Sequence, residues 1–185
     1  GRDFHNDCRM LKRAYTAGVM STGVNLLNLS DATFPLTQFT IRRFGASGGI
    51  YVSSGHLYSD EVGLRMINAG GIELAPSEVE RVADIYEDFP AQIRRAKPNE
   101  IGQITAIPQT DDIYVKSLQQ FVDKKKIKDA DLKIVVDCSY GPTGKITPIL
   151  INEIGEEVIA LNTHFRQKSR NPVPDINNIR NNSEF

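Results

Sequence analysis

The chain has 185 residues, of which 40% are hydrophobic and 24% are charged, the composition of a soluble globular protein with one large or two small domains. Its 22 basic and 23 acidic side chains leave a net charge of −1, so no overall field favours nucleic acid or an anionic membrane surface. No apolar run approaches the roughly 20 residues that a membrane-spanning helix needs. We therefore expect no nucleic-acid partner and no membrane insertion.

The chain has two cysteines, Cys8 and Cys138, too few for a disulfide framework and too sparse for a zinc site. We expect both thiols to be free and buried, as suits a reducing cytoplasm. The histidines His5 and His164 belong to no metal-ligand spacing. The sequence therefore predicts no metal site in this chain.

Apolar spacing in the first half of the chain predicts alternating helices and strands. Residues 7–22 repeat apolar side chains at helical spacing, with Arg9, Lys12 and Arg13 on the other side of the helix. The further predicted elements are a strand at 24–29, a helix at 34–44, strands at 50–52 and 62–67, and an acidic helix at 76–86. This order is typical of a layered α/β domain.

The pattern begins again after residues 88–110, a proline-containing stretch that we interpret as a connection between domains. The elements predicted beyond it are a helix at 111–125, a strand at 132–136, a helix ending at 154 and a strand at 158–161. The last three predict a βαβ unit. Residues 166–185 have almost no apolar pattern, and we expect them to be extended or disordered.

The loop after the strand at 50–52 contains polar residues where open α/β sheets place ligands. Ser53 or Ser54 could pair with His56 as nucleophile and base. However, residues this close in sequence rarely reach that geometry, and no third, orienting group is evident. The sequence alone therefore does not predict a local catalytic triad.

Two other stretches favour structural interpretations. Residues 139–145 lie between a strand and a helix, but Ser139 and Ile146 stand where a phosphate-binding Walker loop needs glycine and a hydroxyl residue. We interpret this stretch as a tight turn with a solvent-facing lysine. The basic run at 124–128 is interpreted as a solvated corner at a helix end, where cations complement the helix dipole.

The order and spacing of several short segments carry a family resemblance. In the first half they are residues 1–3 (Gly-Arg-Asp), 9–14, 21–24, 48–50 and 62–65, and in the second half 133–137, Gly141, 154–155, 157–158, 161–162 and 171–174. These segments resemble the first domain and the start of the second domain of the α-D-phosphohexomutases. The resemblance implies α/β layers repeated in two domains, each with a mixed sheet between helices.

The resemblance also implies domain boundaries. Residues 1–110 correspond to domain I with its connector, and residues 111–185 to part of domain II. The strand that should lead into Gly1 is missing, so we interpret the chain as a fragment of a longer protein.

In that family a serine within a Thr-Ala-Ser-His-Asn-Pro loop carries a phosphoryl group, and its position here is Gly55. Glycine has no atom to phosphorylate, so the resemblance implies no catalytic residue at this position. Ser53 and Ser54 are fallback nucleophiles if the loop shifts by one or two residues.

Three positions carried over from the family are predicted to bind substrate: His5, His56 and Arg65. Arg65 stands where the family has a lysine thought to assist proton transfer. A guanidinium can hold a phosphate but is a poor acid or base near neutral pH, because it stays protonated. These departures favour loss of mutase chemistry.

The altered site favours a phosphomannomutase/phosphoglucomutase-like region, itself not catalytic, within a sugar-phosphate or nucleotide-sugar biosynthetic protein of the mannose-1-phosphate guanylyltransferase type. Two alternatives stay open: a fragment of a phosphohexomutase that interconverts hexose 1-phosphate and hexose 6-phosphate, and a stand-alone interaction domain. In each case we expect this chain alone to be inactive.

The resemblance implies further partners and a location. Expected partners are the remaining domains of the longer protein, hexose phosphate, and a second copy in a homo-oligomer. We expect no cofactor in this chain, and magnesium in the longer protein if that protein is an active mutase or nucleotidyltransferase. The expected location is the cytoplasm.

Overall fold

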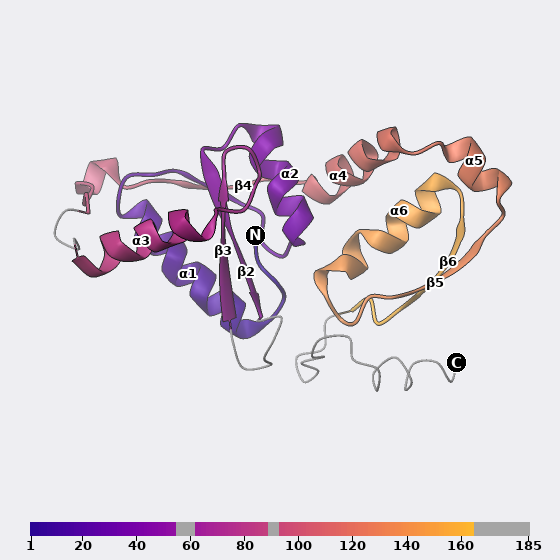
Figure 1. The fold of residues 1–185 in the computed structure, drawn as a ribbon, viewed down its shortest axis with the longest axis horizontal. Helices are drawn as coiled ribbons and strands as arrows, with labels where there is room; N and C mark the ends of the chain where they lie inside the picture. The colour runs from indigo at the N-terminus through magenta and orange to yellow at the C-terminus, as the bar shows by residue number, and fades with distance from the viewer. Residues whose placement is uncertain (55–61, 89–92, 165–185) are drawn as a thin grey trace.

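The computed structural model describes residues 1–54, 62–88 and 93–164. The chain forms two parts that follow each other in sequence, and Figure 1 shows them side by side, joined through the helix that begins at Thr110. Gly55, His56 and the predicted extended tail at 166–185 lie outside the described residues.

The three helices of the first part lie where their apolar spacing predicts them. They are α1 (Asn6–Met20), α2 (Phe34–Phe44) and α3 (Pro76–Asp88). Local signals fix both ends of α2. The Thr33 hydroxyl accepts a hydrogen bond from the Leu36 amide at 3.2 Å, and Gly45 ends the helix with φ of 63°, a left-handed conformation that glycine adopts without a Cβ penalty.

The strands of the first part form two pairs. Strand β1 (Leu26–Asn28) runs parallel to β4 (Ile104–Ala106), and β2 (Gly48–Ser54) runs antiparallel to β3 (Val62–Asn68). Strand β4 lies within the stretch that the sequence suggested was only a connection. That interpretation was incomplete, because β4 gains its hydrogen bonds from a partner far away in sequence.

Residues 1–3 join the two strand pairs. Arg2 forms parallel bridges with both Asp31 and Val52. The Asp3 amide donates to the Val52 carbonyl at 2.8 Å, and the Ala32 amide donates to the Arg2 carbonyl at 3.0 Å. The start of the chain is thus an extended segment that lies between β2 and residues 31–32, which follow β1.

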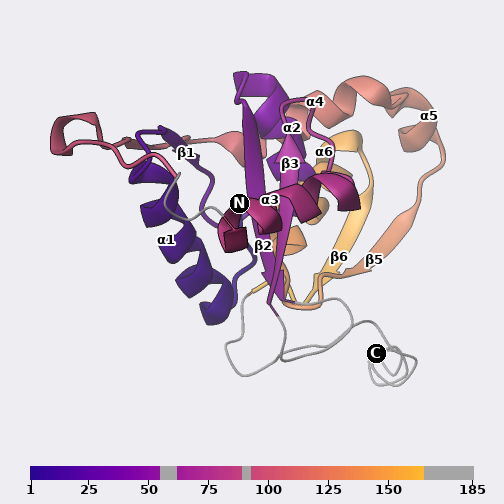
Figure 2. The same ribbon diagram turned by 60° about the vertical axis from the view of Figure 1, so that its left-hand side comes forward.

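The second part contains α4 (Thr110–Leu118), α5 (Lys124–Asp129), α6 (Thr147–Ile154), and the parallel strands β5 (Lys133–Asp137) and β6 (Glu157–Leu161). Figure 2 shows α6 beside the β5–β6 pair. The chain returns from β5 to β6 through α6, which confirms the predicted βαβ unit. Short 3-10 helices occur at Pro98–Glu100, Gln119–Phe121 and Pro142–Lys145.

The prediction of one helix over 111–125 was wrong. The α-helix ends at Leu118, and a new helix begins after Asp123, whose carboxylate accepts a hydrogen bond from the Lys126 amide at 3.2 Å. An aspartate in this position caps the start of a helix. The basic run therefore begins α5 rather than ending a longer helix, although its side chains are exposed as expected.

Two clusters of buried apolar side chains form the core. One contains Ile41, Tyr51 and Ile67 within the first part. The other, which we call the shared cluster, contains Ala32 and Leu36 from the first part and Val115 and Ile146 from the second. The two parts therefore contact each other through apolar packing. The rings of Phe39 and Tyr114, at 5.1 Å between centroids, extend this contact.

Cys8 and Cys138 are both buried and free, as predicted. Within the described part of the chain, no helix has the length and apolar character required to cross a membrane.

Candidate functional site

The candidate site lies where residues 1–3 and β2 end side by side. These segments run parallel, so their carboxyl ends meet at one edge, the position where open α/β sheets bind ligands. Helix α1 begins at Asn6, directly after His5, and β2 ends at Ser54. We call Asp3, His5, Asp31 and Ser53 the strand-end edge.

Hydrogen bonds fix the backbone of this edge. The Asp3 carboxylate accepts from the Phe4 amide at 2.6 Å, which turns the chain from the extended segment toward α1. His5 occupies the N-cap position of α1 without a side-chain capping bond. An imidazole at this position can donate to an anionic or carbonyl oxygen.

The Asp31 carboxylate contacts one cationic side chain from each part of the molecule. Arg2 forms an ion pair with this carboxylate, and the Lys145 ammonium lies 3.9 Å from its other oxygen. Lys145 also lies 5.2 Å from the centre of the Phe4 ring. Burial lowers the pKa of Arg2, and the charge of Asp31 partly opposes that effect. Asp31 therefore supports a buried guanidinium beside the edge.

Lys145 confirms one sequence interpretation and adds contacts that the sequence did not predict. The turn at 139–145 was expected to carry a solvent-facing lysine, and this side chain is indeed 47% exposed. Nevertheless, its ammonium points toward Asp31 and Phe4 of the first part. Neither Lys145 nor Asp31 was predicted at the site, because no local pattern links residues so far apart in sequence.

Arg65, predicted to bind substrate phosphate, is engaged within the first part. It lies on β3 opposite Tyr51 and forms a two-point contact with Glu73, with distances of 2.9 Å from Nε and 2.6 Å from Nη2. Its guanidinium carbon lies 3.6 Å from the centre of the Phe34 ring. The hydrogen bonds that Arg65 donates to the Glu73 carboxylate raise the pKa of Arg65, because they favour the charged guanidinium. A phosphate would have to share this guanidinium with a carboxylate.

The two fallback nucleophiles lie at the end of β2. Ser53 is buried and pairs with Gly63, while Ser54 pairs with Val62 as the last residue of the strand. A serine buried within a paired strand has no open approach for a sugar phosphate. His5 and Ser53 lie on the same edge, whereas Gly55 and His56 fall outside the described residues, so the role of the loop stays a prediction.

Within 1–54, 62–88 and 93–164, no three His, Cys, Asp or Glu side chains form a group that could hold a metal ion. The strand-end edge offers the imidazole of His5 and the carboxylates of Asp3 and Asp31 for hydrogen bonding and charge interactions.

Comparison with known proteins shows that the chain is similar to phosphoglucomutases, phosphomannomutases and phosphoglucosamine mutases. Residues 1–92 match the family model described as phosphoglucomutase/phosphomannomutase, alpha/beta/alpha domain I. The chain is 30% identical to a phosphoglucomutase/phosphomannomutase of Thermococcus kodakarensis over 97% of this chain and 39% of that protein. It is 29% identical to a phosphoglucosamine mutase of Natranaerobius thermophilus over 92% of this chain and 38% of that protein.

Solved structures share the fold. A phosphoglucomutase/phosphomannomutase family protein from Burkholderia thailandensis aligns with a TM-score of 0.78 and 21% identity, over 99% of this chain and 39% of that one. A putative phosphomannomutase from Thermus thermophilus aligns with a TM-score of 0.72 and 16% identity, over 90% of this chain and 37% of that one. The predicted layered α/β class is thereby confirmed. The chain spans less than half the length of each of these proteins.

Proposed function

We propose that this chain is the first domain and part of the second domain of a phosphohexomutase that acts on hexose phosphates, because the family match and the relatives support the phosphohexomutase superfamily. The longer protein would interconvert a hexose 1-phosphate and a hexose 6-phosphate. The relatives that match nearly the whole chain are named as mutases, and this favours a mutase over the guanylyltransferase type that the altered site suggested.

The observation that carries this proposal is the strand-end edge. The 2.8 Å hydrogen bond from the Asp3 amide to the Val52 carbonyl holds the start of α1 beside the end of β2. His5 therefore lies next to the strand that leads into the loop of Gly55 and His56. A sugar phosphate at this edge would meet His5, with His56 expected on the neighbouring loop.

The same edge limits the chemistry that this chain can supply. Gly55 cannot carry a phosphoryl group, and Ser53 is buried within β2. Burial makes Ser53 a poor fallback nucleophile, and a role for Ser54 stays a prediction. We assign binding rather than nucleophilic roles to His5, His56 and Arg65.

The test uses the full-length protein that contains this chain, purified and assayed with magnesium, the cofactor expected in the longer protein. Glucose 1-phosphate, mannose 1-phosphate and glucosamine 1-phosphate are each offered with a trace of the matching bisphosphate. We expect one of them to be converted into its 6-phosphate. No conversion of any of the three would contradict the proposal.

A matched pair of variants then tests the edge. His5→Ala should lower kcat/KM at least tenfold, because it removes a donor beside the bound phosphate. Arg43→Ala, at the other end of α2 from Asp31, serves as the surface control and should leave kcat/KM within twofold. Equal effects of the two substitutions would remove His5 from the site.

The second candidate is the non-catalytic region of a mannose-1-phosphate guanylyltransferase type. Gly55 and the commitment of Arg65 to Glu73 favour it, since both weaken phosphoryl transfer at this site. The same preparation is incubated with GTP and mannose 1-phosphate. Formation of GDP-mannose without any mutase product would replace the first proposal with this one.

A further inference from the structure

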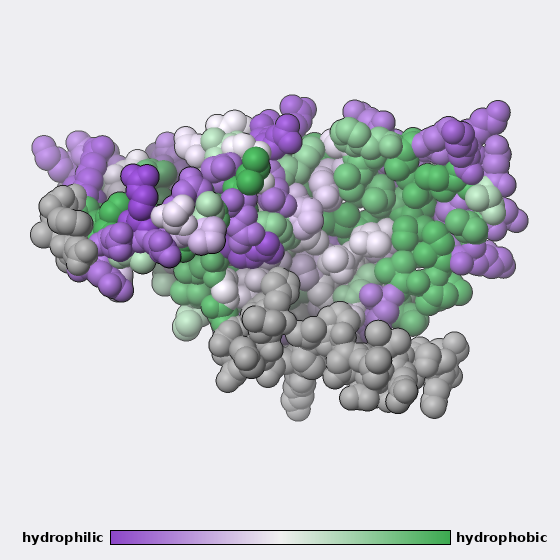
Figure 3. All heavy atoms as spheres, viewed as in Figure 1, coloured by the Kyte–Doolittle hydropathy of each residue, from purple (hydrophilic) through white to green (hydrophobic). Residues whose placement is uncertain are grey.

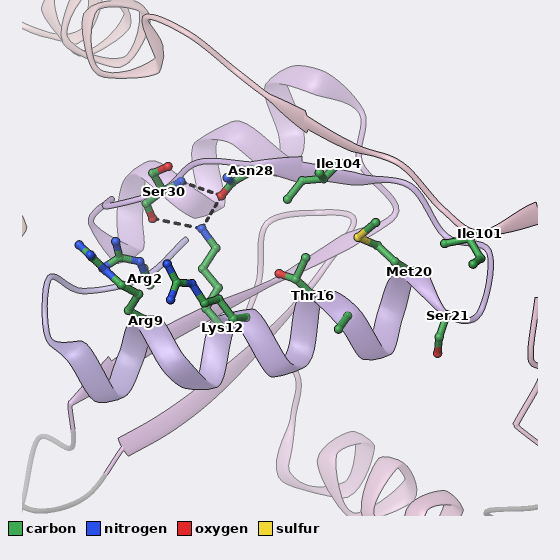
Figure 4. Close-up of a pocket in the computed structure, with 12 residues that line it drawn as sticks. Arg2, Arg9, Lys12, Thr16, Met20, Ser21, Asn28, Ser30, Ile101 and Ile104 are labelled. Atoms are coloured by element: carbon green, nitrogen blue, oxygen red, sulfur yellow. Dashed lines mark hydrogen bonds between the residues drawn. The ribbon is translucent and has the colours of Figure 1, made fainter. Parts of the chain in front are cut away.

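A second region, which adjoins the strand-end edge at Arg2, combines charge with a cavity. The cavity measures about 670 Å³ and lies between α1 and the chain around β1 and β4. Its basic end is formed by Arg2, Arg9, Lys12 and Arg13, and Figure 4 shows Arg2, Arg9 and Lys12 gathered near Ser30. We call it the basic cavity. Asp3, His5, Ser53 and Arg65 do not line it.

Helix geometry brings these cations together. Arg9, Lys12 and Arg13 are spaced three and four residues apart, so they lie on one face of α1. The Arg2 side chain, only 8% exposed, joins them from the extended segment. The sequence suggested that the helical cations were simply the polar side of α1, and the structure instead shows them along a cavity.

The positive charge of the basic cavity exceeds the negative charge beside it. Its lining contains four cationic side chains and no carboxylate. Asp31 pairs with Arg2, while no ion pair among the described residues involves Arg9 or Arg13. Lys12 donates to the Asn28 amide oxygen and to the Ser30 carbonyl at 3.4 Å. An anion bound at this end of the cavity would therefore contact cationic hydrogen-bond donors that already lie close together.

The other end of the cavity is apolar. Met20, Ile101 and Ile104 line it, and Figure 4 places them along the cavity away from the arginines. Ile101 and Ile104 are exposed by 50% and 48%, and Met20 is partly buried beside them, which leaves apolar surface for a ligand to cover. Ligand cavities of this size commonly combine an apolar lining with a few polar groups that orient the ligand.

We propose that the basic cavity binds a soluble phosphomonoester, with its phosphate at Arg9, Lys12 and Arg13 and an apolar body against Met20, Ile101 and Ile104. Arginine matches phosphate because its planar donors can bind two oxygens at once. The site goes beyond the proposed mutase function, since its ligand binds apart from the hexose phosphate expected at the strand-end edge.

The test measures binding by calorimetry at constant ionic strength in the full chain, with inorganic phosphate and n-hexyl phosphate as probes. Hexyl phosphate should bind at least tenfold more tightly than inorganic phosphate, because its alkyl chain can bury apolar surface at the apolar end of the cavity. n-Hexanol should bind at least tenfold more weakly than hexyl phosphate. Hexanol binding as tightly as hexyl phosphate would overturn the proposal.

Two charge-matched double variants locate the site. Arg9→Gln with Arg13→Gln should weaken hexyl phosphate binding at least tenfold. Arg42→Gln with Arg43→Gln removes the same charge from the last turn of α2 and should change binding by less than twofold. An equal loss in both double variants would mean that net charge alone attracts the probe, and would overturn the assignment.

Two further measurements need no substitution. Hexyl phosphate should shift the backbone amide resonances of residues 9–13 and 28–30 in the nuclear magnetic resonance spectrum, and shifts confined to other residues would overturn the site. Vesicles of phosphatidylcholine with phosphatidic acid offer the same phosphate chemistry on a lipid. We expect the protein not to cosediment with these vesicles. Cosedimentation would contradict the proposal that the ligand is a soluble phosphomonoester.

Discussion

The central strand of the first part, β2, is buried on both faces, whereas the strand pair of the second part leaves apolar side chains exposed. On β2 the neighbouring residues Tyr51 and Val52 are 5% and 0% exposed. Neighbouring side chains of a strand point to opposite faces, so both faces of β2 are covered. On β5 and β6, by contrast, Val135 and Ile159 are 64% and 53% exposed.

The difference follows from how many elements surround each strand pair. Strand β2 contacts α1, α2, β3 and residues 1–3, while the β5–β6 pair is covered by α6 on one side. Figure 3 shows the result as a larger green area over the second part than over the first. A two-stranded pair with one helix encloses too little space to bury both of its faces. The stability of this chain should therefore reside in the first part and in the shared cluster.

The largest effect expected is that of Leu36→Ala. Leu36 is 0% exposed and belongs to the shared cluster, so its truncation leaves a cavity between the two parts. We expect a loss of about 3 kcal/mol in the free energy of unfolding, measured by urea denaturation. A loss below about 1 kcal/mol would show that the shared cluster does not support the fold.

A smaller effect of opposite sign is expected for Lys12→Met within the first part. Burial, and then the charge of Arg2, lowers the pKa of Lys12 to about 8 from 10.5, while Asp31 acts in the other direction. Protonated Lys12 therefore destabilises the folded state most fully below pH 8, and this cost fades as the pH rises toward 10.5.

Methionine keeps the apolar stem without the charge, so Lys12→Met should stabilise the protein at pH 7. We expect a gain of at most about 1 kcal/mol, since solvent screens part of the charge. The measurement is the thermal midpoint of both proteins from pH 7 to pH 10, with the difference shrinking as the pH rises. A difference that grows with pH would contradict the assigned cause.

The smallest effect is expected in the second part. Val135→Thr changes a side chain that is 64% exposed on β5, and threonine keeps the β-branched shape that strands favour. The free energy of unfolding should change by less than about 0.5 kcal/mol. Val52→Thr, the same substitution at a 0% exposed position of β2, is the matched control and should cost considerably more. Similar costs at both positions would remove the contrast between the two parts.

The sequence predicted the elements whose signals are local. Apolar spacing located α1, α2 and α3, and the helix that was predicted to end at 154 is α6, which Gly155 ends. It does so with φ of 109°, a conformation that favours glycine. Asp123 shows the limit of periodicity, because one capping aspartate divided a stretch whose apolar spacing suited a single helix.

The rest depended on partners that are distant in sequence. Strand β4 has three residues in a proline-containing stretch, and only pairing with β1 makes it a strand. At the site, the sequence supplied His5, Ser53 and Arg65, but not the carboxylates Glu73 and Asp31 that hold Arg65 and Arg2. Such ion pairs depend on tertiary packing, so motif and spacing do not predict them.

Amide hydrogen exchange can measure how fast the extended segment at residues 1–3 detaches from its two neighbours. Its hydrogen bonds engage the amide protons of Asp3 and Val52 on one side and that of Ala32 on the other. Amide exchange with deuterium occurs when such bonds open. The three amide protons should therefore exchange at one common rate if the segment detaches as a unit. They should exchange at different rates if its hydrogen bonds to Val52 open before the one from Ala32.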